Sequence, residues 1–128
     1  MLRNIFNFLR RSHTPGARSM ALEAGDLVSV ESDNDQFAVA KILVKDAHGV
    51  HVRLYVQRFT ERPLQVNAAD LDTAPYGPDH DFPFSIGHMP LGFASFDTWQ
   101  PELISRANPV IEEELVGYRI WQEGGGYF

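Results

Sequence analysis

The sequence contains no cysteine. A chain without thiols has no disulfide framework, no zinc–thiolate cluster and no cysteine nucleophile. Its first residues also lack the uninterrupted apolar run of a secretory signal, because Asn4, Asn7, Arg10 and Arg11 break every candidate stretch. These absences favour a reducing compartment, and we expect a cytoplasmic protein that does not bind a membrane.

Basic residues are scarce outside the first twenty positions. That opening segment carries four arginines and no acidic residue, whereas residues 21–128 hold seven basic residues against all 17 acidic ones, a net charge of −10. A surface with this charge repels phosphates and attracts cationic proteins. The sequence therefore predicts a basic protein as partner and argues against nucleic acid.

The length of 128 residues suits one domain with one hydrophobic core. We expect a basic leader over residues 1–20, helical or disordered, followed by a single α+β domain over residues 21–128. The leader carries an apolar stripe at helical spacing, formed by Leu2, Ile5, Phe6 and Leu9. Three roles stay open for it: a helix that docks on the domain, a weak interfacial anchor, or a dispensable extension with Met20 as an alternative start.

Two stretches rich in β-branched and aromatic residues, 36–45 and 50–59, predict a β-hairpin with the four-residue loop Asp46–Gly49. Placing Lys45 opposite Val50 fixes the register. The predicted core side consists of Phe37, Val39, Leu43, Val52, Leu54 and Val56. The predicted opposite side consists of Ala38, Ala40, Ile42, His51, Arg53, Tyr55, Gln57 and Phe59.

The last segment predicts a helix that packs on the sheet. Asn108 is a candidate cap, Pro109 suits a first helical position, and Gly124 is placed to end the helix. A glycine at position 117 weakens a helix, which suggests that something packs closely there. Alternation of apolar residues over 116–120 leaves a strand as an alternative.

The fold class that these patterns predict is α+β, a twisted antiparallel sheet covered by a C-terminal helix. Partial closure of the sheet into a barrel stays open.

Residues 72–83 form an irregular acidic stretch, which inside a compact domain is more often functional than idle. Phe96, Trp99 and Leu103 stand at helical spacing and predict two short helical pieces.

Catalytic and metal motifs are weak. His48 and His51 stand three apart, and the run from Asp79 to Asp81 with His88 forms a second imidazole and carboxylate group. No metalloprotease helix or facial-triad spacing accompanies them. We therefore expect no metal, no cofactor and no catalytic residue, and we do not expect an enzyme.

Several segments give the chain a resemblance to a known group of proteins. In chain order they are Gly25 and Asp26 ahead of a strand, Phe37 to Leu43, His51 to Tyr55, Ile86 to Leu91, Phe96 with Trp99, and Glu113 to Trp121. Over residues 22–128 they resemble small bacterial proteins, some of which are similar to immunity proteins of polymorphic-toxin and contact-dependent inhibition systems. The resemblance implies a cytoplasmic protein that binds a cognate toxin domain, often a cationic nuclease, and blocks its active site.

Carboxylates that mimic phosphate would make such a contact, with aromatic residues as anchors. The expected partner-binding residues are Asp70, Asp72, Tyr76, Asp79, Asp81, Phe82, Glu112, Glu113 and Glu114. A module that binds single-stranded nucleic acid through the Arg53 and Tyr55 strand face is the alternative, because His51, Arg53, Tyr55 and Phe59 have a spacing suited to base stacking. A small hydrolase or metal protein is a third possibility.

Overall fold

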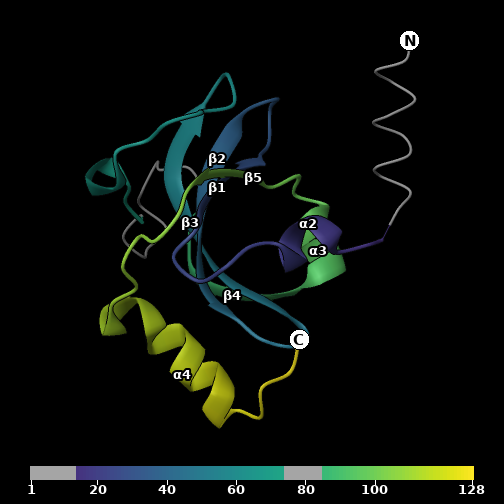
Figure 1. The fold of residues 1–128 in the computed structure, drawn as a ribbon. Helices are drawn as coiled ribbons and strands as arrows, with labels where there is room; N and C mark the ends of the chain where they lie inside the picture. Colours follow the sequence, from purple (N-terminus) through teal and green to yellow (C-terminus); the bar gives the residue numbers. More distant parts are fainter. Residues whose placement is uncertain (1–13, 74–84) are drawn as a thin grey trace.

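A computed structural model describes residues 14–73 and 85–128 of the chain. Five antiparallel strands form one open sheet in the order β4-β3-β2-β1-β5 (Figure 1). The strands are β1 (Leu27–Glu31), β2 (Phe37–Lys45), β3 (Gly49–Phe59), β4 (Ile86–Gly92) and β5 (Glu102–Ser105). The predicted α+β class with an antiparallel sheet is confirmed, and the sheet does not close into a barrel.

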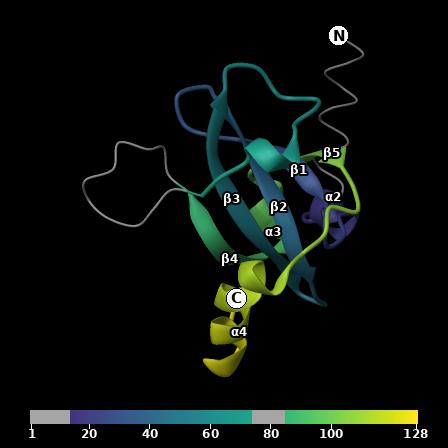
Figure 2. The ribbon, with the colours of Figure 1, turned by 90° about the vertical axis from the view of Figure 1, so that its left-hand side faces the viewer.

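Short helices lie on both faces of this sheet. They are α2 (Ala17–Met20), α3 (Phe93–Asp97), the 3-10 turns η1 (Ala68–Asp70) and η2 (Glu112–Leu115), and α4 (Val116–Glu123). Helices α2 and α3 lie on one face, whereas η1 and the chain that leads to α4 lie on the other (Figures 1 and 2). Across the described ranges, no helix has the length and apolar character needed to cross a bilayer.

The central hairpin has the predicted loop but not the predicted faces. Lys45 pairs with Val50 as expected, but Val44 then pairs with His51 and Ile42 with Val52, so Leu43 is an extra residue in β2. Such a β-bulge reverses which side chains share a face beyond it. The predicted pairing of core residues across the two strands was therefore wrong.

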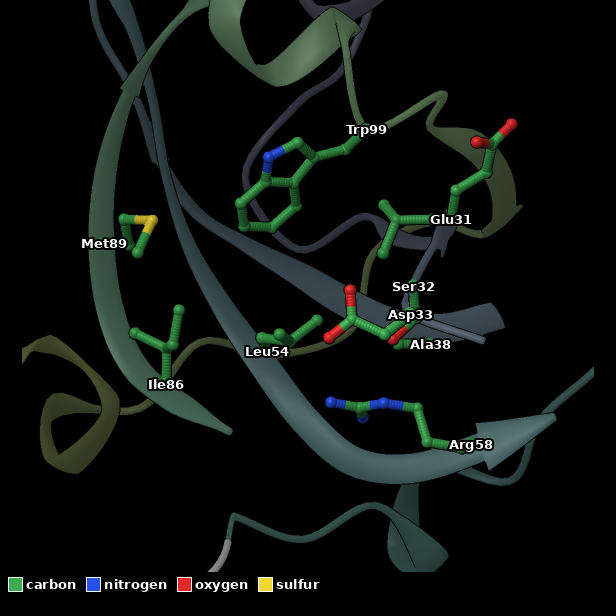
Figure 3. Close-up of a pocket in the computed structure, with 10 residues that line it drawn as sticks. Glu31, Ser32, Asp33, Ala38, Leu54, Arg58, Ile86, Met89 and Trp99 are labelled. Atoms are coloured by element: carbon green, nitrogen blue, oxygen red, sulfur yellow. The ribbon is translucent and has the colours of Figure 1, made fainter. Parts of the chain in front are cut away.

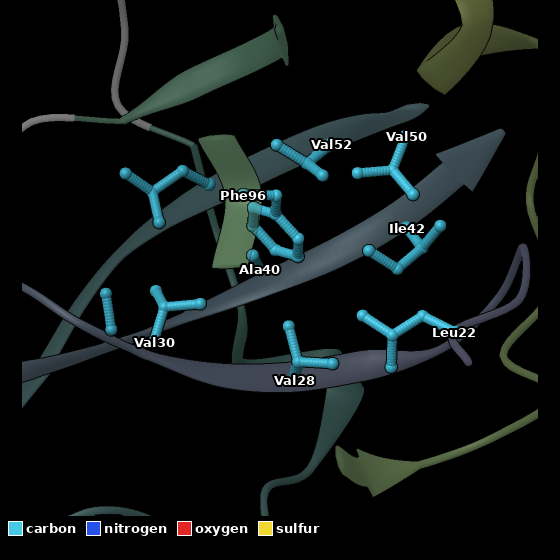
Figure 4. Packing of buried hydrophobic residues seen from close by; sticks show 10 residues of the cluster. Leu22, Val28, Val30, Ala40, Ile42, Val50, Val52 and Phe96 are labelled. Atoms are coloured by element: carbon cyan, nitrogen blue, oxygen red, sulfur yellow. The ribbon is translucent and has the colours of Figure 1, made fainter. Parts of the chain in front are cut away.

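The main core lies on the face that α2 and α3 cover. Strand β2 contributes Ala38, Ala40 and Ile42, and strand β3 contributes Val50, Val52 and Leu54. Phe96 of α3, fully buried, fills the centre of this cluster (Figure 4). On the opposite face a smaller cluster consists of Leu27, Val39 and Tyr55.

A tight turn joins β1 to β2. Asn34 and Asp35 both have positive φ, 59° and 56°, and the Gln36 N–H donates to the Asp33 carbonyl. Two left-handed residues in succession define a type I′ turn, which matches the twist of the flanking strands. Asn and Asp tolerate this conformation better than other non-glycine residues.

The C-terminal segment is a helix, as predicted, but it begins later. Residues 109–111 do not form its first turn, because the Asn108 amide group donates to the Gly25 carbonyl and the Lys41 ammonium donates to the Pro109 carbonyl at 2.6 Å. The helix ends at Gly124 as expected. Leu103 lies in strand β5, opposite Val28, and not in the predicted helical piece.

The part of the expected leader that the structure describes, residues 14–20, packs against α3. Ser19 is fully buried, and its backbone N–H donates to the Asp97 carboxylate at 2.8 Å. The Ser19 hydroxyl donates to the same carboxylate and lies 3.1 Å from the Phe93 carbonyl. Helix α2 is therefore attached to the body of the protein by hydrogen bonds.

We expect Ser19→Ala to lower the free energy of unfolding by about 1–2 kcal/mol, because it removes the hydroxyl donor of a buried, charge-assisted hydrogen bond. The measurement is urea unfolding followed by circular dichroism. Ser95→Ala is the matched control, since the Ser95 side chain is exposed. Equal stabilities for the two variants would contradict this role of Ser19.

Candidate functional site

The structure places the expected partner-binding residues in different surroundings. Tyr76, Asp79, Asp81 and Phe82 lie outside the described residues. Asp70 and Asp72 lie beside strand β3, where the Gln57 amide donates to the Asp70 carbonyl at 2.8 Å and the Val56 N–H donates to the Asp72 carbonyl at 2.8 Å. Both residues are exposed.

The three consecutive glutamates also separate. Glu112 is exposed and pairs with Arg119 at 3.2 Å, and Glu113 is exposed without a side-chain partner in the described part of the chain. Glu114 is buried, and both of its carboxylate oxygens accept from Lys41 at 3.0 Å. Its Oε1 also accepts from the Ile111 N–H. The carboxylate of Glu114 is thus committed to an internal ion pair.

Strand pairing gathers four other acidic residues at one end of the sheet. Strand β1 ends at Glu31, β2 begins at Phe37 and β3 ends at Phe59, and these three residues are paired across the sheet. The residues brought together, which we call the acidic end, are Glu31, Asp33, Asp35 and Glu61. All four are exposed, and within the described ranges the carboxylates of Glu31, Asp35 and Glu61 make no hydrogen bond or ion pair.

The basic residues at the same end are bound internally. The Arg62 guanidinium donates to the carbonyls of Ser29 and Gln100 and pairs with Glu102 at 2.9 Å. It also lies over the Phe37 ring. Arg58 donates to the Tyr55 carbonyl at 2.6 Å. Among the described residues, four carboxylates thus stand against two guanidiniums, of which Arg62 is bound internally and Arg58 lines a pocket, so the net charge of this end is negative.

An apolar pocket of about 290 Å³ opens at the acidic end (Figure 3). Its walls come from strands β1 to β4 and the turn after α3, and the apolar lining consists of Val30, Ala38, Leu54, Ile86, Met89 and Trp99. Asp33 and Arg58 lie next to each other at one side of the pocket. Burial lowers the pKa of Arg58, and the Asp33 carboxylate opposes that shift. The pocket can therefore accept an apolar side chain from a partner whose cations contact the surrounding carboxylates.

The sequence pattern does not indicate this site. The segment Ser32 to Asp35 has the composition of a turn between strands, and its acidic residues are not close to Glu61 in the sequence. The pairing of strand ends that brings Glu61 to Glu31 depends on the full sheet.

A second polar cluster joins the central hairpin to α4. His51 is fully buried, its Nε2 lies 3.2 Å from Asp46 Oδ2, and its Nδ1 lies 3.0 Å from His88 Nε2. Since a carboxylate only accepts, His51 Nε2 carries the proton towards Asp46, and His88 Nε2 donates to His51 Nδ1. The rings of Tyr118 and Trp121 lie with centroids 4.7 and 4.4 Å from that of His51.

Burial keeps both histidines neutral. It lowers the pKa of His51 against the opposing effect of Asp46, and it lowers the pKa of His88 to about 4, with His51 adding to that shift. Burial opposes ionisation of Asp46, but hydrogen bonds from His48, His51 and Gly49 hold its pKa below the usual value. The cluster has no opening to solvent at His51, and it serves to attach α4.

Gly117 makes this attachment possible. A Cβ added at position 117 would lie 2.5 Å from the Cβ of His88. The sequence-based expectation of close packing at Gly117 is confirmed.

The expected nucleic-acid face differs from the prediction. His51 is covered by α4, and Tyr55 is only 7% exposed, so neither ring presents a face on which a base can stack. Arg53 donates through Nε to the Gly87 carbonyl. Among the described residues, no group of three His, Cys, Asp or Glu side chains is arranged to hold a metal ion.

Comparisons of the chain with protein-family models, with curated proteins and with solved structures give no match.

We expect Glu114→Gln to lower the free energy of unfolding by about 3 kcal/mol, because it leaves the Lys41 ammonium buried without a compensating charge. Glu113→Gln, one residue away and exposed, should change it by less than about 0.5 kcal/mol. Urea unfolding of both variants gives the comparison. Equal losses would show that the Lys41–Glu114 pair does not stabilise the fold.

We expect stability to fall as the pH is lowered from 6.5 towards 4. Over this range an unfolded chain protonates His88 whereas the folded protein does not, so protons favour unfolding. One such histidine changes the free energy of unfolding by at most about 1.4 kcal/mol per pH unit, and the partial exposure of His88 makes the change smaller. Urea unfolding at pH 7, 6 and 5 measures it.

His88→Gln should flatten this pH dependence in part, since His51 still titrates in the same direction. His48→Gln, which replaces an exposed histidine, is the control and should keep the slope of the unchanged protein. A His88→Gln protein with an undiminished slope would contradict the assignment.

Proposed function

We propose that the protein is an immunity protein that binds a basic toxin domain, a nuclease in the first instance, and inhibits it stoichiometrically. The observation that carries the proposal is the acidic end, with its exposed carboxylates around an apolar pocket. The partner's cations would contact Glu31, Asp35 and Glu61, and one apolar side chain would enter the pocket beside Trp99. In protein interfaces a few buried anchor residues usually contribute most of the binding free energy, and a polar rim surrounds them.

The charge distribution supports rapid association. An acidic surface raises the encounter rate with a cationic protein tenfold to a thousandfold. A phosphate-binding nuclease site is basic, so carboxylates at this end can occupy it as phosphate oxygens would. The proposed place of action is the cytoplasm, where a toxin of this kind meets its target.

The alternative of single-strand binding has less support. Its stacking residues His51 and Tyr55 are buried, and the free charges at the acidic end repel phosphate.

The inhibitory function is tested by co-expressing this chain in bacterial cells with each toxin-like domain found encoded in the genes next to its own. We expect growth to be restored and a one-to-one complex to form, measured by size-exclusion chromatography with light scattering. Failure to restore growth would overturn the proposal. Salt-sensitive binding of a 20-nucleotide single-stranded DNA would favour the alternative instead.

The location of the contact is tested by charge removal without change of shape. We expect Glu31→Gln, Asp35→Asn and Glu61→Gln together to slow association with a fluorescent nona-arginine peptide about tenfold at low salt, because they remove the steering field. The control removes three charges from the α4 region through Glu112→Gln, Glu113→Gln and Glu123→Gln. Equal effects of the two triple variants on stopped-flow rates would rule out the acidic end as the site.

A further inference from the structure

The sheet face opposite the main core contains a separate cavity of about 450 Å³. It lies between the strands, η1 and the chain that leads from β5 to η2, which share this face (Figure 2). Its polar lining residues are Lys41, Arg53, Tyr55, Asn108, Glu113 and Glu114. None of these belongs to the acidic end.

Tyr55 places an unused hydrogen-bond donor at this cavity. The residue is 7% exposed, and its hydroxyl has no hydrogen-bond partner within the described ranges. Burial raises the pKa of Tyr55 to about 12, with Glu114 adding to the shift and Arg53 opposing it. The hydroxyl therefore keeps its proton. Because no buried side-chain oxygen in the described part of the chain lacks a partner, this hydroxyl is open to the cavity, where a bound acceptor can reach it.

Arg53 supplies further donors beside this hydroxyl. Its Nε donates to the Gly87 carbonyl at 3.1 Å, which fixes the plane of the guanidinium. In the described part of the chain, its terminal nitrogens have no partner. A planar guanidinium held in this way suits two-point recognition of a carboxylate.

The nearby carboxylates do not fill this role. Glu114 accepts from Lys41 and from the Ile111 N–H, and the Lys41–Glu114 pair is neutral as a unit. Glu113 is exposed at the rim. The walls between the polar groups are apolar and include Leu27, Leu71 and Ile111.

We propose that this cavity binds a small organic acid, with its carboxylate between the Tyr55 hydroxyl and the Arg53 guanidinium and its apolar body against Leu27, Leu71 and Ile111. The carboxylate accepts from the phenol O–H and from the terminal N–H groups of Arg53. The apolar body lies against the apolar part of a mixed lining, since small-molecule sites combine apolar walls with a few polar groups that fix the orientation of the ligand.

The test is an NMR titration of the full chain with acetate, benzoate and 3-phenylpropanoate, each compared with its uncharged amide. We expect the two aromatic acids to shift the signals of residues around the cavity and to bind at least tenfold more tightly than their amides. Acetate, which lacks the apolar body, should bind more weakly than either. If no acid shifts these signals, or if acids and amides bind equally, the proposal is overturned.

Two variants test the assigned donors. Tyr55→Phe and Arg53→Gln should each weaken 3-phenylpropanoate binding about tenfold, as expected for the loss of a hydrogen bond to a charged group. Tyr118→Phe removes a phenol hydroxyl on α4 that accepts from Gln122, and it should leave binding unchanged. Thermal melts confirm that each variant is folded. Unchanged affinity in folded Tyr55→Phe would exclude the proposed geometry, whatever the outcome of the toxin experiments.

Discussion

The irregular pairing of strands β2 and β3, with an extra residue at Leu43 and a second register shift between Ala38 and Ala40, determines which side chains meet on each face of the sheet. The bulge at Leu43 aligns Ala40 and Ile42 with the apolar residues of β3, and α3 covers that face with Phe96. The same bulge places Lys41 on the opposite face with the polar residues of β3. One face is therefore a dry core, and the other must satisfy buried polar groups.

Two of the buried polar residues on that second face have specific side-chain partners. His51 is held between Asp46 and His88 under the rings of α4, while Lys41 pairs with Glu114. These contacts also position the C-terminal segment, since Glu114 and the rings belong to it. Docking of α4 thus depends on matched polar partners as well as on apolar area, and a mismatch is costly because the groups cannot return to water.

Local patterns predicted the hairpin loop, the helix end at Gly124 and the close approach at Gly117, because each depends on a few neighbouring residues. The hairpin faces could not be predicted, since a bulge at Leu43 leaves no mark in the alternation of side chains. Leu103 has helical spacing with Trp99, but pairing with Val28 places it in a strand. The acidic end could be predicted only from the order of the strands. The cavity beside Arg53 and Tyr55 could be predicted only from the position of η1.

The type I′ turn has a consequence for how its charges meet a partner. Asn34 and Asp35 hold a backbone conformation that few residues adopt, and the cross-strand bond between the Ser32 N–H and the Gln36 carbonyl closes the turn. A long flexible loop would lose conformational entropy when it bound a partner. That loss would offset part of the favourable electrostatic free energy of binding. On a tight hairpin the carboxylates are preorganised, so recognition begins from a shape that already exists.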